Sequence, residues 1–344
     1  MTDLSADARQ RALVHWLHAT LRTDDFTLTT ASADASFRRY FRVSLASRHA
    51  LAPDARTLIV MDAPPPMEDC RPFVYVARLL IAAGVHAPSV LAQDLPQGFL
   101  LLTDLGMTTY LAALDSAAAP GLYADALEAL VRLQRASSEA ELPPYDEATL
   151  ARELALFPDW YITRHLDRVL TADERATLAS AYQAILKNNL AQPRVFVHRD
   201  YHSRNLMVAT PNPGVLDFQD AVYGPITYDL VSLLRDAYIE WEEERQLDWA
   251  VRYWERARKA ALPVSADFAL FWRDFEWMGV QRQLKVLGIF ARLAYRDRKD
   301  GYLKDLPRVM RYVRAACNRY RELGPLAGLL DALADRSPAV DYSF

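Results

Sequence analysis

Residues 195–208, with the sequence VFVHRDYHSRNLMV, place a loop of polar and charged side chains between two apolar, strand-like runs. His198, Asp200 and Asn205 form the pattern H-x-D-x-x-x-x-N in this loop, and Asp217 ends the next apolar run, GVL. Taken alone, the loop could be an ordinary polar turn between two strands. The joint pattern of strand, motif, strand and aspartate favours a catalytic loop, because a short hairpin would bring Asn205 and Asp217 together.

These side chains suit the transfer of a phosphoryl group from ATP. Such a transfer needs little covalent chemistry from the protein, but it needs a carboxylate that orients the attacking hydroxyl and oxygen ligands for Mg²⁺. Asp200 suits the first task. Asn205 and Asp217 suit the second, since Mg²⁺ prefers hard oxygen ligands and few protein carboxylates. The motif therefore predicts a kinase that uses ATP and Mg²⁺.

The segments HRDYHSRNLMV, GVLDFQDA and YDLVSLLRD together resemble the aminoglycoside-phosphotransferase-like branch of the protein-kinase-like fold. The resemblance implies that Asp200 is the catalytic base and that Asn205 and Asp217 bind Mg²⁺. It also implies that Asp229 supports the catalytic loop from a helix. The alternative for Asp229 is a charge that merely favours a helix N-terminus. We expect His198 to be a structural residue of the loop.

Two features favour a kinase of small molecules over a protein kinase. Protein kinases usually have Lys two residues after the catalytic Asp, whereas this chain has His202, as the small-molecule branch does. Only seven residues separate Asp217 from Pro225. This leaves no room for an activation loop and a peptide platform, so we predict a small hydroxylated substrate.

The order of the secondary-structure patterns predicts the architecture. The first hundred residues alternate strand patterns with one main helix, whereas long helical patterns dominate after Gly106. A chain of 344 residues is long enough for two lobes. We predict an α+β, two-lobed protein-kinase-like fold, with a small β-rich N-lobe over residues 1–104 and a larger, mostly helical C-lobe over residues 105–344.

Apolar spacing and capping signals predict the individual elements. Residues 3–22 are expected to form an amphipathic helix, and FTLTTASADASFRRYFRVSL is expected to form a β-hairpin with ASADAS at its turn. Pro72 and Gly84 bound a helix predicted between them. The helical patterns of the C-lobe cover residues 119–136, 146–168, 172–190, 225–261, 265–296 and 304–335.

Charge and composition exclude several classes of function. A net charge of −4 gives no reason to expect nucleic acid or an anionic membrane as a partner, and no protein partner is implied. Cys70 and Cys317 are the two cysteines and lie far apart, which argues against a disulfide framework or a cysteine zinc site. The polar N-terminus and the lack of an apolar run of about 20 residues lead us to expect a cytoplasmic protein.

The nucleotide-binding side departs from the usual kinase pattern. The hairpin that would cover the phosphates contains no glycine, and Met61 occupies the position of the lysine that usually positions ATP. The following helix contains no Glu to pair with such a lysine. We expect Ser36, Phe37, Arg38 and Arg39 to contact the phosphates, with at least one of the two arginines supplying the positive charge.

The adenine is expected at the junction of the lobes, against backbone groups around Thr103 and Leu105. The arginines of the hairpin have an alternative interpretation as solvated surface charges, and the missing lysine keeps open a non-catalytic, ATP-binding scaffold. The intact set of Asp200, Asn205 and Asp217 argues against such a scaffold.

A basic stripe on the helix pattern 265–296 bears on the acceptor. At 100° per residue, one narrow arc of the helix contains Arg282, Lys285, Ile289, Arg292 and Arg296. Within the arc itself, there are no acidic partners at a spacing of four residues, although such partners usually accompany exposed basic residues. It is therefore either a solvated basic face or part of the acceptor pocket, with Arg282, Lys285 and Arg292 as the candidates.

Together with YDEATLARELALFPDWY and KVLGIFARL, these segments are similar to the bacterial N-acetylmuramate/N-acetylglucosamine anomeric kinases of cell-wall recycling. The resemblance implies phosphorylation of the C1 hydroxyl to an α-1-phosphate. The lactyl carboxylate of N-acetylmuramate would suit the basic arc. Glu153, His202 and Asp220 are further candidates for contact with the sugar, although Glu153 could instead be a solvated charge on its helix.

Two other functions remain open at this point. Choline, homoserine or an aminoglycoside could be the acceptor, and for a polycation such as an aminoglycoside an acidic rather than a basic pocket would be expected. A non-catalytic scaffold would bind ATP without turnover. Both amino sugars remain open as acceptors within the leading prediction.

Overall fold

The structure, a computed structural model, describes residues 4–33, 37–65 and 67–334. It divides into two compact units, each made of two stretches of chain. Unit 1 comprises Met1–Tyr110 and Asn205–Asp220, and unit 2 comprises Leu111–Arg204 and Ala221–Phe344. The sequence places a single boundary after residue 104, and it does not show that the short stretch after the catalytic loop packs with unit 1. The assignment of the nucleotide site to an N-lobe and of the catalytic loop to a C-lobe stays a prediction.

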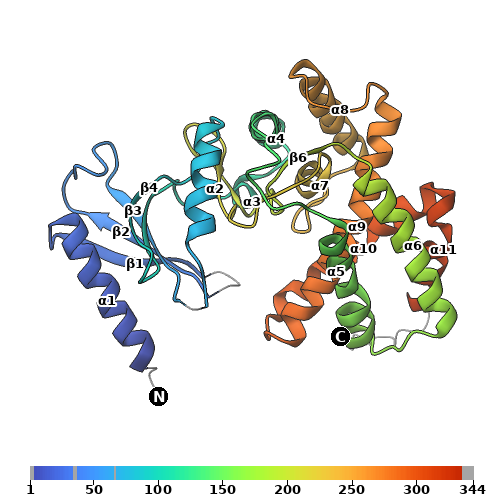
Figure 1. Cartoon of the computed structure of the whole chain (residues 1–344), viewed down its shortest axis with the longest axis horizontal. Helices are drawn as coiled ribbons and strands as arrows, with labels where there is room; N and C mark the ends of the chain where they lie inside the picture. The colour runs from blue at the N-terminus through green and yellow to red at the C-terminus, as the bar shows by residue number, and fades with distance from the viewer. Residues whose placement is uncertain (1–3, 34–36, 66, 335–344) are drawn as a thin grey trace. The chain divides into compact units, whose positions relative to one another are not determined.

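Unit 1 is built on one antiparallel sheet (Figure 1). Its strands, in spatial order, are β1 (Phe26–Ala33), β2 (Arg39–Leu45), β3 (Thr57–Asp62), β5 (Phe99–Thr103) and β4 (Val90–Asp94). The first two strands form the predicted hairpin, with Phe26 opposite Leu45. Residues 34–36 of its predicted turn lie outside the described residues.

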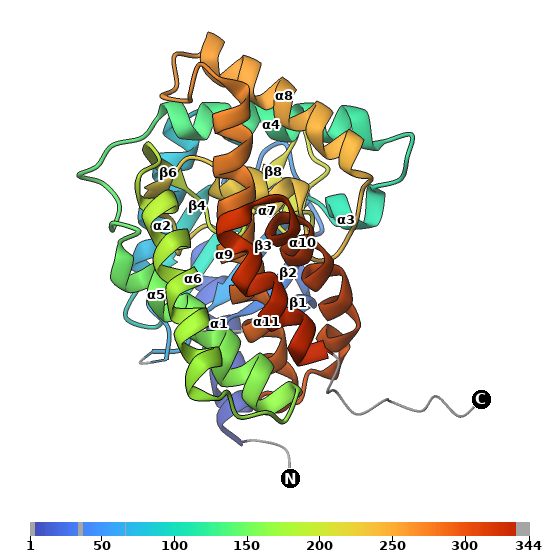
Figure 2. The same cartoon turned by 90° about the vertical axis from the view of Figure 1, so that its right-hand side faces the viewer.

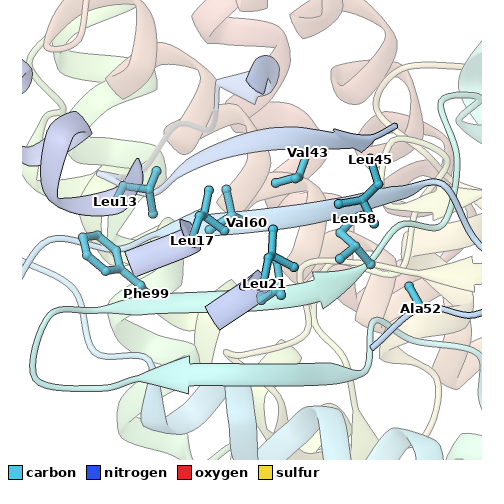
Figure 3. Packing of buried hydrophobic residues seen from close by; sticks show 10 residues of the cluster. Leu13, Leu17, Leu21, Val43, Leu45, Ala52, Leu58, Val60 and Phe99 are labelled. Carbon is cyan, nitrogen blue, oxygen red and sulfur yellow. The ribbon is translucent and has the colours of Figure 1, made fainter. Parts of the chain in front are cut away.

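The helix α1 (Leu4–Leu21) packs its apolar stripe on this sheet, as the spacing of its leucines predicts. Leu13, Leu17 and Leu21 are fully buried, and Figure 3 shows them facing Val43 and Val60 of the strands. Burial of one leucine side chain contributes roughly 1.5–3 kcal/mol. This packing holds the strands that carry the predicted nucleotide-binding residues.

The second half of unit 1 joins the helix α2 (Arg71–Ala82) to a short hairpin. The hairpin consists of β7 (Leu206–Met207) and β8 (Gly214–Val215), which pair antiparallel. The ring of Phe73 on α2 lies 4.7 Å, centroid to centroid, from the ring of Phe218 just beyond the hairpin. The predicted hairpin between Asn205 and Asp217 is therefore present, and it belongs to the unit that carries the large sheet.

Unit 2 is mostly helical, with one two-stranded sheet of β6 (Arg194–Val197) and β9 (Val222–Pro225). The long helix α9 (Phe268–Tyr295) is its central element, and α5, α6, α7 and α10 pack against it (Figure 2). The α-helices of this unit are α4 (Ala119–Arg135), α5 (Glu147–Leu156), α6 (Ala172–Leu190), α7 (Tyr228–Leu234), α8 (Glu243–Lys259), α9, α10 (Leu306–Arg319) and α11 (Gly324–Ala334). A short α3 (Tyr110–Ala113) precedes them.

Three predicted helical patterns are interrupted, and each break has a local cause. The pattern 225–261 is split into α7 and α8, because the Asp236 carboxylate accepts a hydrogen bond from the N–H of Tyr238 and forms a turn. The pattern 304–335 is split where the backbone of Tyr320 is extended. After α5 the chain continues as the π-helix η1 (Phe157–His165), whose second residue is a proline without an N–H.

The remaining short elements of unit 2 are the 3₁₀-helices η2 (Asp300–Asp305) and η3 (Arg321–Leu323). Among the described residues, no helix is long and apolar enough to cross a membrane.

A glycine lets α9 approach the end of α5 closely. A Cβ atom placed on Gly288 would lie 2.4 Å from the carbonyl oxygen of Leu156, which is shorter than any normal contact. The close approach matters for the site, because α5 carries Glu153 and α9 carries Arg282 and Lys285.

Candidate active site

The predicted catalytic loop follows β6 and folds tightly around Asp200. The Asp200 N–H donates to Nδ1 of His198 at 3.2 Å, and the His202 N–H donates to the carbonyl oxygen of Asp200 at 3.0 Å. Arg199 has a φ of 77°, in the left-handed region that non-glycine residues rarely adopt. A strained backbone beside a predicted catalytic residue is typical of functional loops.

Asp229, at the start of α7, contacts the backbone of this loop directly. Its carboxylate accepts hydrogen bonds from the N–H of His198 at 2.6 Å and from the N–H of Arg199 at 3.0 Å. Burial raises the pKa of Asp229 to about 7, and the nearby charge of Asp200 adds to this effect, although the two backbone hydrogen bonds act in the opposite direction. These are the contacts that a supporting residue needs, and the role of Asp229 itself stays a prediction.

Glu153 on α5 is buried among positive charges and is not a solvated helix charge. Its Oε1 lies 2.6 Å from Nη2 of Arg199 and 2.8 Å from Nζ of Lys285, and its Oε2 accepts hydrogen bonds from Tyr145 and Gln281. Burial alone would raise the pKa of Glu153, but Lys285 and Arg199 outweigh burial, so the pKa is lowered. We call Glu153, Arg199, Lys285 and Tyr145 the Glu153 cluster.

The basic arc of α9 is buried at Arg282 and Lys285, so the solvated-face alternative is wrong for both. Lys285 donates a hydrogen bond to the hydroxyl of Tyr228 at 3.0 Å, and Arg282 donates through Nη2 to Oγ of Ser232 at 2.7 Å. Within the part of the chain that the structure describes, Nε and Nη1 of Arg282 are buried and have no hydrogen-bond partner. Arg292 is half-buried. Contact of these residues with a substrate stays a prediction.

The charges around Asp200 keep its carboxylate ionised. Burial would raise the pKa of Asp200, but the positive charges of Lys285 and Arg282, with His202 and Arg199, lower it. Burial lowers the pKa of His202, whose ring stands edge-on to Tyr238 with centroids 5.5 Å apart. Asp200 is therefore an anion near neutral pH, as an acceptor of a hydroxyl proton must be.

In unit 1, the predicted metal ligands Asn205 and Asp217 lie side by side. Nδ2 of Asn205 is 3.3 Å from Oδ2 of Asp217, and Asp217 has a φ of 61°. Gln219 donates to Asp217 at 2.9 Å and to Asp220 at 3.3 Å, so Asp220 lies close to the pair. An amide and a carboxylate fit Mg²⁺, which usually takes its remaining ligands from phosphates and water.

The described residues contain no group of three or more His, Cys, Asp or Glu side chains arranged to hold a metal ion. The predicted pair of Asn205 and Asp217 contains only one carboxylate, so it is not a group of that kind and stays a prediction. The amide of Asn205 would present its oxygen to a cation after a 180° rotation of the side-chain amide, which is a common alternative assignment.

The three arginines of the β-hairpin have different partners. Arg39 binds the fully buried carboxylate of Asp62, with Nε 3.1 Å from Oδ2. Arg42 binds Asp104 through two nitrogens, at 2.6 and 3.1 Å. Arg38 lies near Asp217, with Nη2 3.7 Å from Oδ1.

The other predicted nucleotide contacts lie nearby in unit 1. Phe37 is 60% exposed, and its backbone N–H donates to Glu68 at 3.1 Å. Ser36 lies outside the described residues. Thr103 ends β5, and Leu105 is buried two residues later. The backbone N–H and C=O of Leu105 make no hydrogen bond to another described residue, so both are available to a ligand.

Two acidic residues of unit 1 have roles that sequence reasoning missed. Glu68 lies 3.9 Å from Arg38, measured from Oε2 to Nε, and Asp62 binds both Arg39 and Arg9 of α1. The sequence search considered only Glu residues inside the helix pattern after Met61, and Glu68 lies just before that helix. A search that extended to the preceding loop would have found it.

Comparison with known proteins identifies the family of this chain. The model of the phosphotransferase enzyme family matches residues 27–272. An N-acetylmuramate/N-acetylglucosamine kinase of Pseudomonas putida is 50% identical over 307 residues, which cover 89% of this chain and 88% of the relative. The enzyme of the same name from Pseudomonas aeruginosa is 49% identical and covers 98% of this chain and 100% of the relative.

Solved structures agree on the fold. A choline/ethanolamine kinase family protein from Mesorhizobium loti gives a TM-score of 0.62 at 16% identity, over 96% of this chain and 100% of the other. An aminoglycoside phosphotransferase gives a TM-score of 0.53 at 14% identity, over 88% and 97% of the two chains. The predicted α+β protein-kinase-like fold and the predicted resemblance are thus confirmed. The chain belongs to the phosphotransferase enzyme family.

Proposed function

We propose that this protein is an ATP- and Mg²⁺-dependent kinase that phosphorylates the anomeric C1 hydroxyl of N-acetylmuramate, N-acetylglucosamine or both. The names of relatives about half identical over nearly the whole chain support the acceptor class. The observation that carries the chemistry is Asp200, a carboxylate whose pKa is lowered by surrounding positive charges, against the effect of burial.

Asp200 has a limited task in the proposed reaction. Its carboxylate accepts a hydrogen bond from the C1 hydroxyl and directs that oxygen toward the γ-phosphorus in line with the leaving ADP oxygen. A new O–P bond forms at C1, the bond to the β,γ-bridging oxygen breaks, and the hydroxyl proton passes to Asp200. A C1 hydroxyl is more acidic than an ordinary alcohol, so a carboxylate of lowered pKa is a sufficient base.

Unit 1 supplies the proposed nucleotide site. Asn205 and Asp217 would hold Mg²⁺, which when bound neutralises charge on the phosphate oxygens. The backbone groups of Leu105, at the end of the β5 segment, are the proposed contacts of the adenine. Thr103 is a further proposed contact there, although its own N–H donates to Ser89.

Unit 2 supplies the proposed acceptor contacts. Arg282 is buried and keeps two N–H groups without a partner among the described residues, which suits the lactyl carboxylate of N-acetylmuramate. Lys285 and Glu153 already bind each other and would orient neutral hydroxyls. His202, Arg292 and Asp220 are further proposed contacts. A polycationic acceptor is disfavoured, because Arg282 and Lys285 would repel it.

An assay with ³²P-labelled ATP and a panel of acceptors tests this function. The panel contains both amino sugars, glucose, choline, homoserine and an aminoglycoside. We expect labelled product from an amino sugar in the presence of Mg²⁺ and none after its removal with EDTA. Transfer only to choline, homoserine or the aminoglycoside would contradict the acceptor assignment, and ATP binding without any transfer would indicate a scaffold.

A further inference from the structure

The helix α7 and the residues just after it contact the predicted catalytic loop at two places. Asp229, in the first turn of the helix, accepts two backbone N–H groups at the start of the loop. Asp236, two residues after the last residue of the helix, accepts the backbone N–H of Ser203 through Oδ2 at 2.9 Å. Asp200 lies in the chain between these two contacts.

Asp236 is set in a rigid part of unit 2. It is 1% exposed, and all the residues of α7 are buried. The helix packs against α9, the central helix of the unit. Because protein interiors are close-packed, a buried helix with a second helix behind it cannot shift easily. A loop that is bonded to this segment takes its position from it.

Ser203 is held through its main chain. Its N–H binds Asp236, and its carbonyl oxygen accepts the N–H of Leu111 at 3.0 Å. Its hydroxyl oxygen is buried and has no hydrogen-bond partner among the described residues. Without Asp236, the N–H of Ser203 would be buried without its acceptor, which is costly. The loop would then have to move until this N–H reached water.

Asp236 also acts on the neighbours of Ser203. Its other carboxylate oxygen, Oδ1, accepts the N–H of Tyr238 at 2.8 Å. The ring of Tyr238 stands edge-on to the ring of His202, and its centroid lies 3.8 Å from the guanidinium carbon of Arg204. One carboxylate thus fixes three consecutive residues of the loop, the middle one directly and its two neighbours through Tyr238.

A displacement of this half of the loop would reach Asp200. Only two residues separate Ser203 from Asp200 along the chain. The N–H of His202 also donates to the carbonyl oxygen of Asp200 at 3.0 Å, so the positions of these two residues are coupled. The connection from Asp236 to the proposed catalytic carboxylate is therefore short.

We propose that Asp236 is a positioning residue for catalysis, which holds the C-terminal half of the catalytic loop so that Asp200 is directed at the acceptor hydroxyl. The inference rests on the proposed kinase function and adds a residue to it. Asp229 has the corresponding place at the N-terminal half of the loop. Since Asp236 does not contact the reacting atoms, its loss should lower kcat and leave nucleotide binding as it is.

Steady-state kinetics of the full-length chain test this, with ATP, Mg²⁺ and the amino sugar that the unsubstituted chain phosphorylates. Asp236→Ala should lower kcat roughly 100-fold, the effect of a small misplacement of a catalytic group, and change the KM for ATP less than about twofold. Asp236→Asn keeps one acceptor oxygen and should recover part of the loss.

Hydrogen exchange followed by mass spectrometry reports on the loop without catalysis. In Asp236→Ala, a peptide that covers residues 198–204 should exchange at least about tenfold faster, since a hydrogen bond to a carboxylate is lost. Peptides from α11, in the same unit, should exchange as in the unsubstituted chain.

The matched control is Asp267→Ala. Asp267 also accepts the N–H of the residue two positions on, that of Ala269 at 2.8 Å, but it does so at the exposed start of α9. The control should leave both kcat and the exchange of residues 198–204 unchanged. A thermal melt shows whether each variant folds, and the same measurements on Asp236→Asn decide if Asp236→Ala does not.

The possible outcomes separate the two proposals. An unchanged kcat in folded Asp236→Ala would overturn this inference alone, as would a loss of kcat without faster exchange of residues 198–204, or an equal loss in the control. A higher KM for ATP with a normal kcat would also overturn it. Absence of phosphoryl transfer by the unsubstituted chain would overturn the proposed function, together with the catalytic role of Asp236.

Discussion

The two compact units each contain a group of charged side chains, and the distances between the charges differ. In unit 2, the Glu153 cluster is buried and close-packed, with Glu153 2.6 Å from Arg199 and 2.8 Å from Lys285. In unit 1, the side chain of Arg38 is 10% exposed and lies 3.7 Å from a carboxylate oxygen of Asp217 and 3.9 Å from one of Glu68. The first arrangement joins charges from distant segments through short contacts, and the second places longer ion pairs beside the predicted metal ligand Asp217.

The free-energy cost of burying a charge explains the close pairing in the Glu153 cluster. Buried charges must be matched by close, hydrogen-bonded partners, because an unpaired charge in the interior costs several kcal/mol. We therefore predict that substitutions in the Glu153 cluster act mainly on stability, whereas substitutions in exposed ion pairs change stability little.

The largest expected effect is that of Asp200→Asn, which keeps the shape of the side chain and removes its basicity. Turnover should fall about 10³-fold, since general-base catalysis contributes roughly 10²–10⁴. Nucleotide affinity should stay unchanged, because we assign the nucleotide to residues of unit 1. Turnover and calorimetric titration measure the two quantities, and near-normal turnover would remove Asp200 from the mechanism.

Glu153→Gln should lower the free energy of unfolding by about 3–5 kcal/mol, the usual cost of breaking a buried ion pair. The matched control is Asp248→Asn in the exposed pair of Asp248 and Arg252, which should change it by less than about 1 kcal/mol. Urea unfolding followed by circular dichroism measures both. Equal effects of the two substitutions would contradict the contrast between the buried and the open charges.

The effect of Glu153→Gln on stability should depend on pH in a defined direction. The pKa of Glu153 is lowered in the folded chain, so its stabilising effect is present above the pKa of the unfolded chain and is lost as pH falls below it. The difference in the free energy of unfolding between the unsubstituted chain and Glu153→Gln should therefore shrink below about pH 4. A difference that persists in acid would indicate a packing effect.

The sequence predicts the hairpin after the catalytic loop better than the surroundings of the charged residues. The spacing of Asp200, Asn205 and Asp217 is local, so the pattern is readable in one dimension, and the hairpin that joins the last two is found. The burial of Glu153 is not readable, since it depends on Arg199 and Lys285 from distant segments. The helical period of α9 identifies the basic arc, but the period is the same whether the arc faces solvent or the interior.

Gly288→Ala should weaken the Glu153 cluster from a distance. The added methyl group would meet the backbone of Leu156, so α9 must move away from α5, and Lys285 moves with it. We expect a loss of about 3 kcal/mol in the free energy of unfolding. Gly328 in α11 has open space around it, and Gly328→Ala should instead add up to about 1 kcal/mol. Equal effects at both glycines would show that the close approach is unimportant.

Asp229→Asn should change the pH dependence of stability. Folded Asp229 keeps its proton to about pH 7, whereas in the unfolded chain the proton leaves near pH 4. Between these values the folded state binds more protons, so stability falls as pH rises. The stability of the variant relative to the unsubstituted chain should thus grow by about 2 kcal/mol between pH 5 and pH 7. Urea unfolding at several pH values measures this. Parallel curves of unfolding free energy against pH for the variant and the unsubstituted chain would contradict the prediction.

The predicted nucleotide-binding residues of unit 1 show what an alignment by motif cannot resolve. Met61 at the lysine position and a helix without Glu suggest a deficient site, and the sequence does not say which arginine of the hairpin has a buried partner. Only the folded chain shows Asp62 between Arg39 and Arg9, and Glu68 beside Arg38. Such contacts between distant segments cannot be predicted from the local pattern of the hairpin.

The position of the new phosphate tests the central proposal most directly. The full-length chain is incubated with ATP, Mg²⁺ and N-acetylmuramate, and the product is analysed by ³¹P and ¹H NMR. The account predicts a phosphate coupled to the anomeric proton of the sugar, with the small coupling between H1 and H2 of an α-anomer. A phosphate coupled to the C6 protons, or an unmodified sugar in the presence of bound nucleotide, would contradict it.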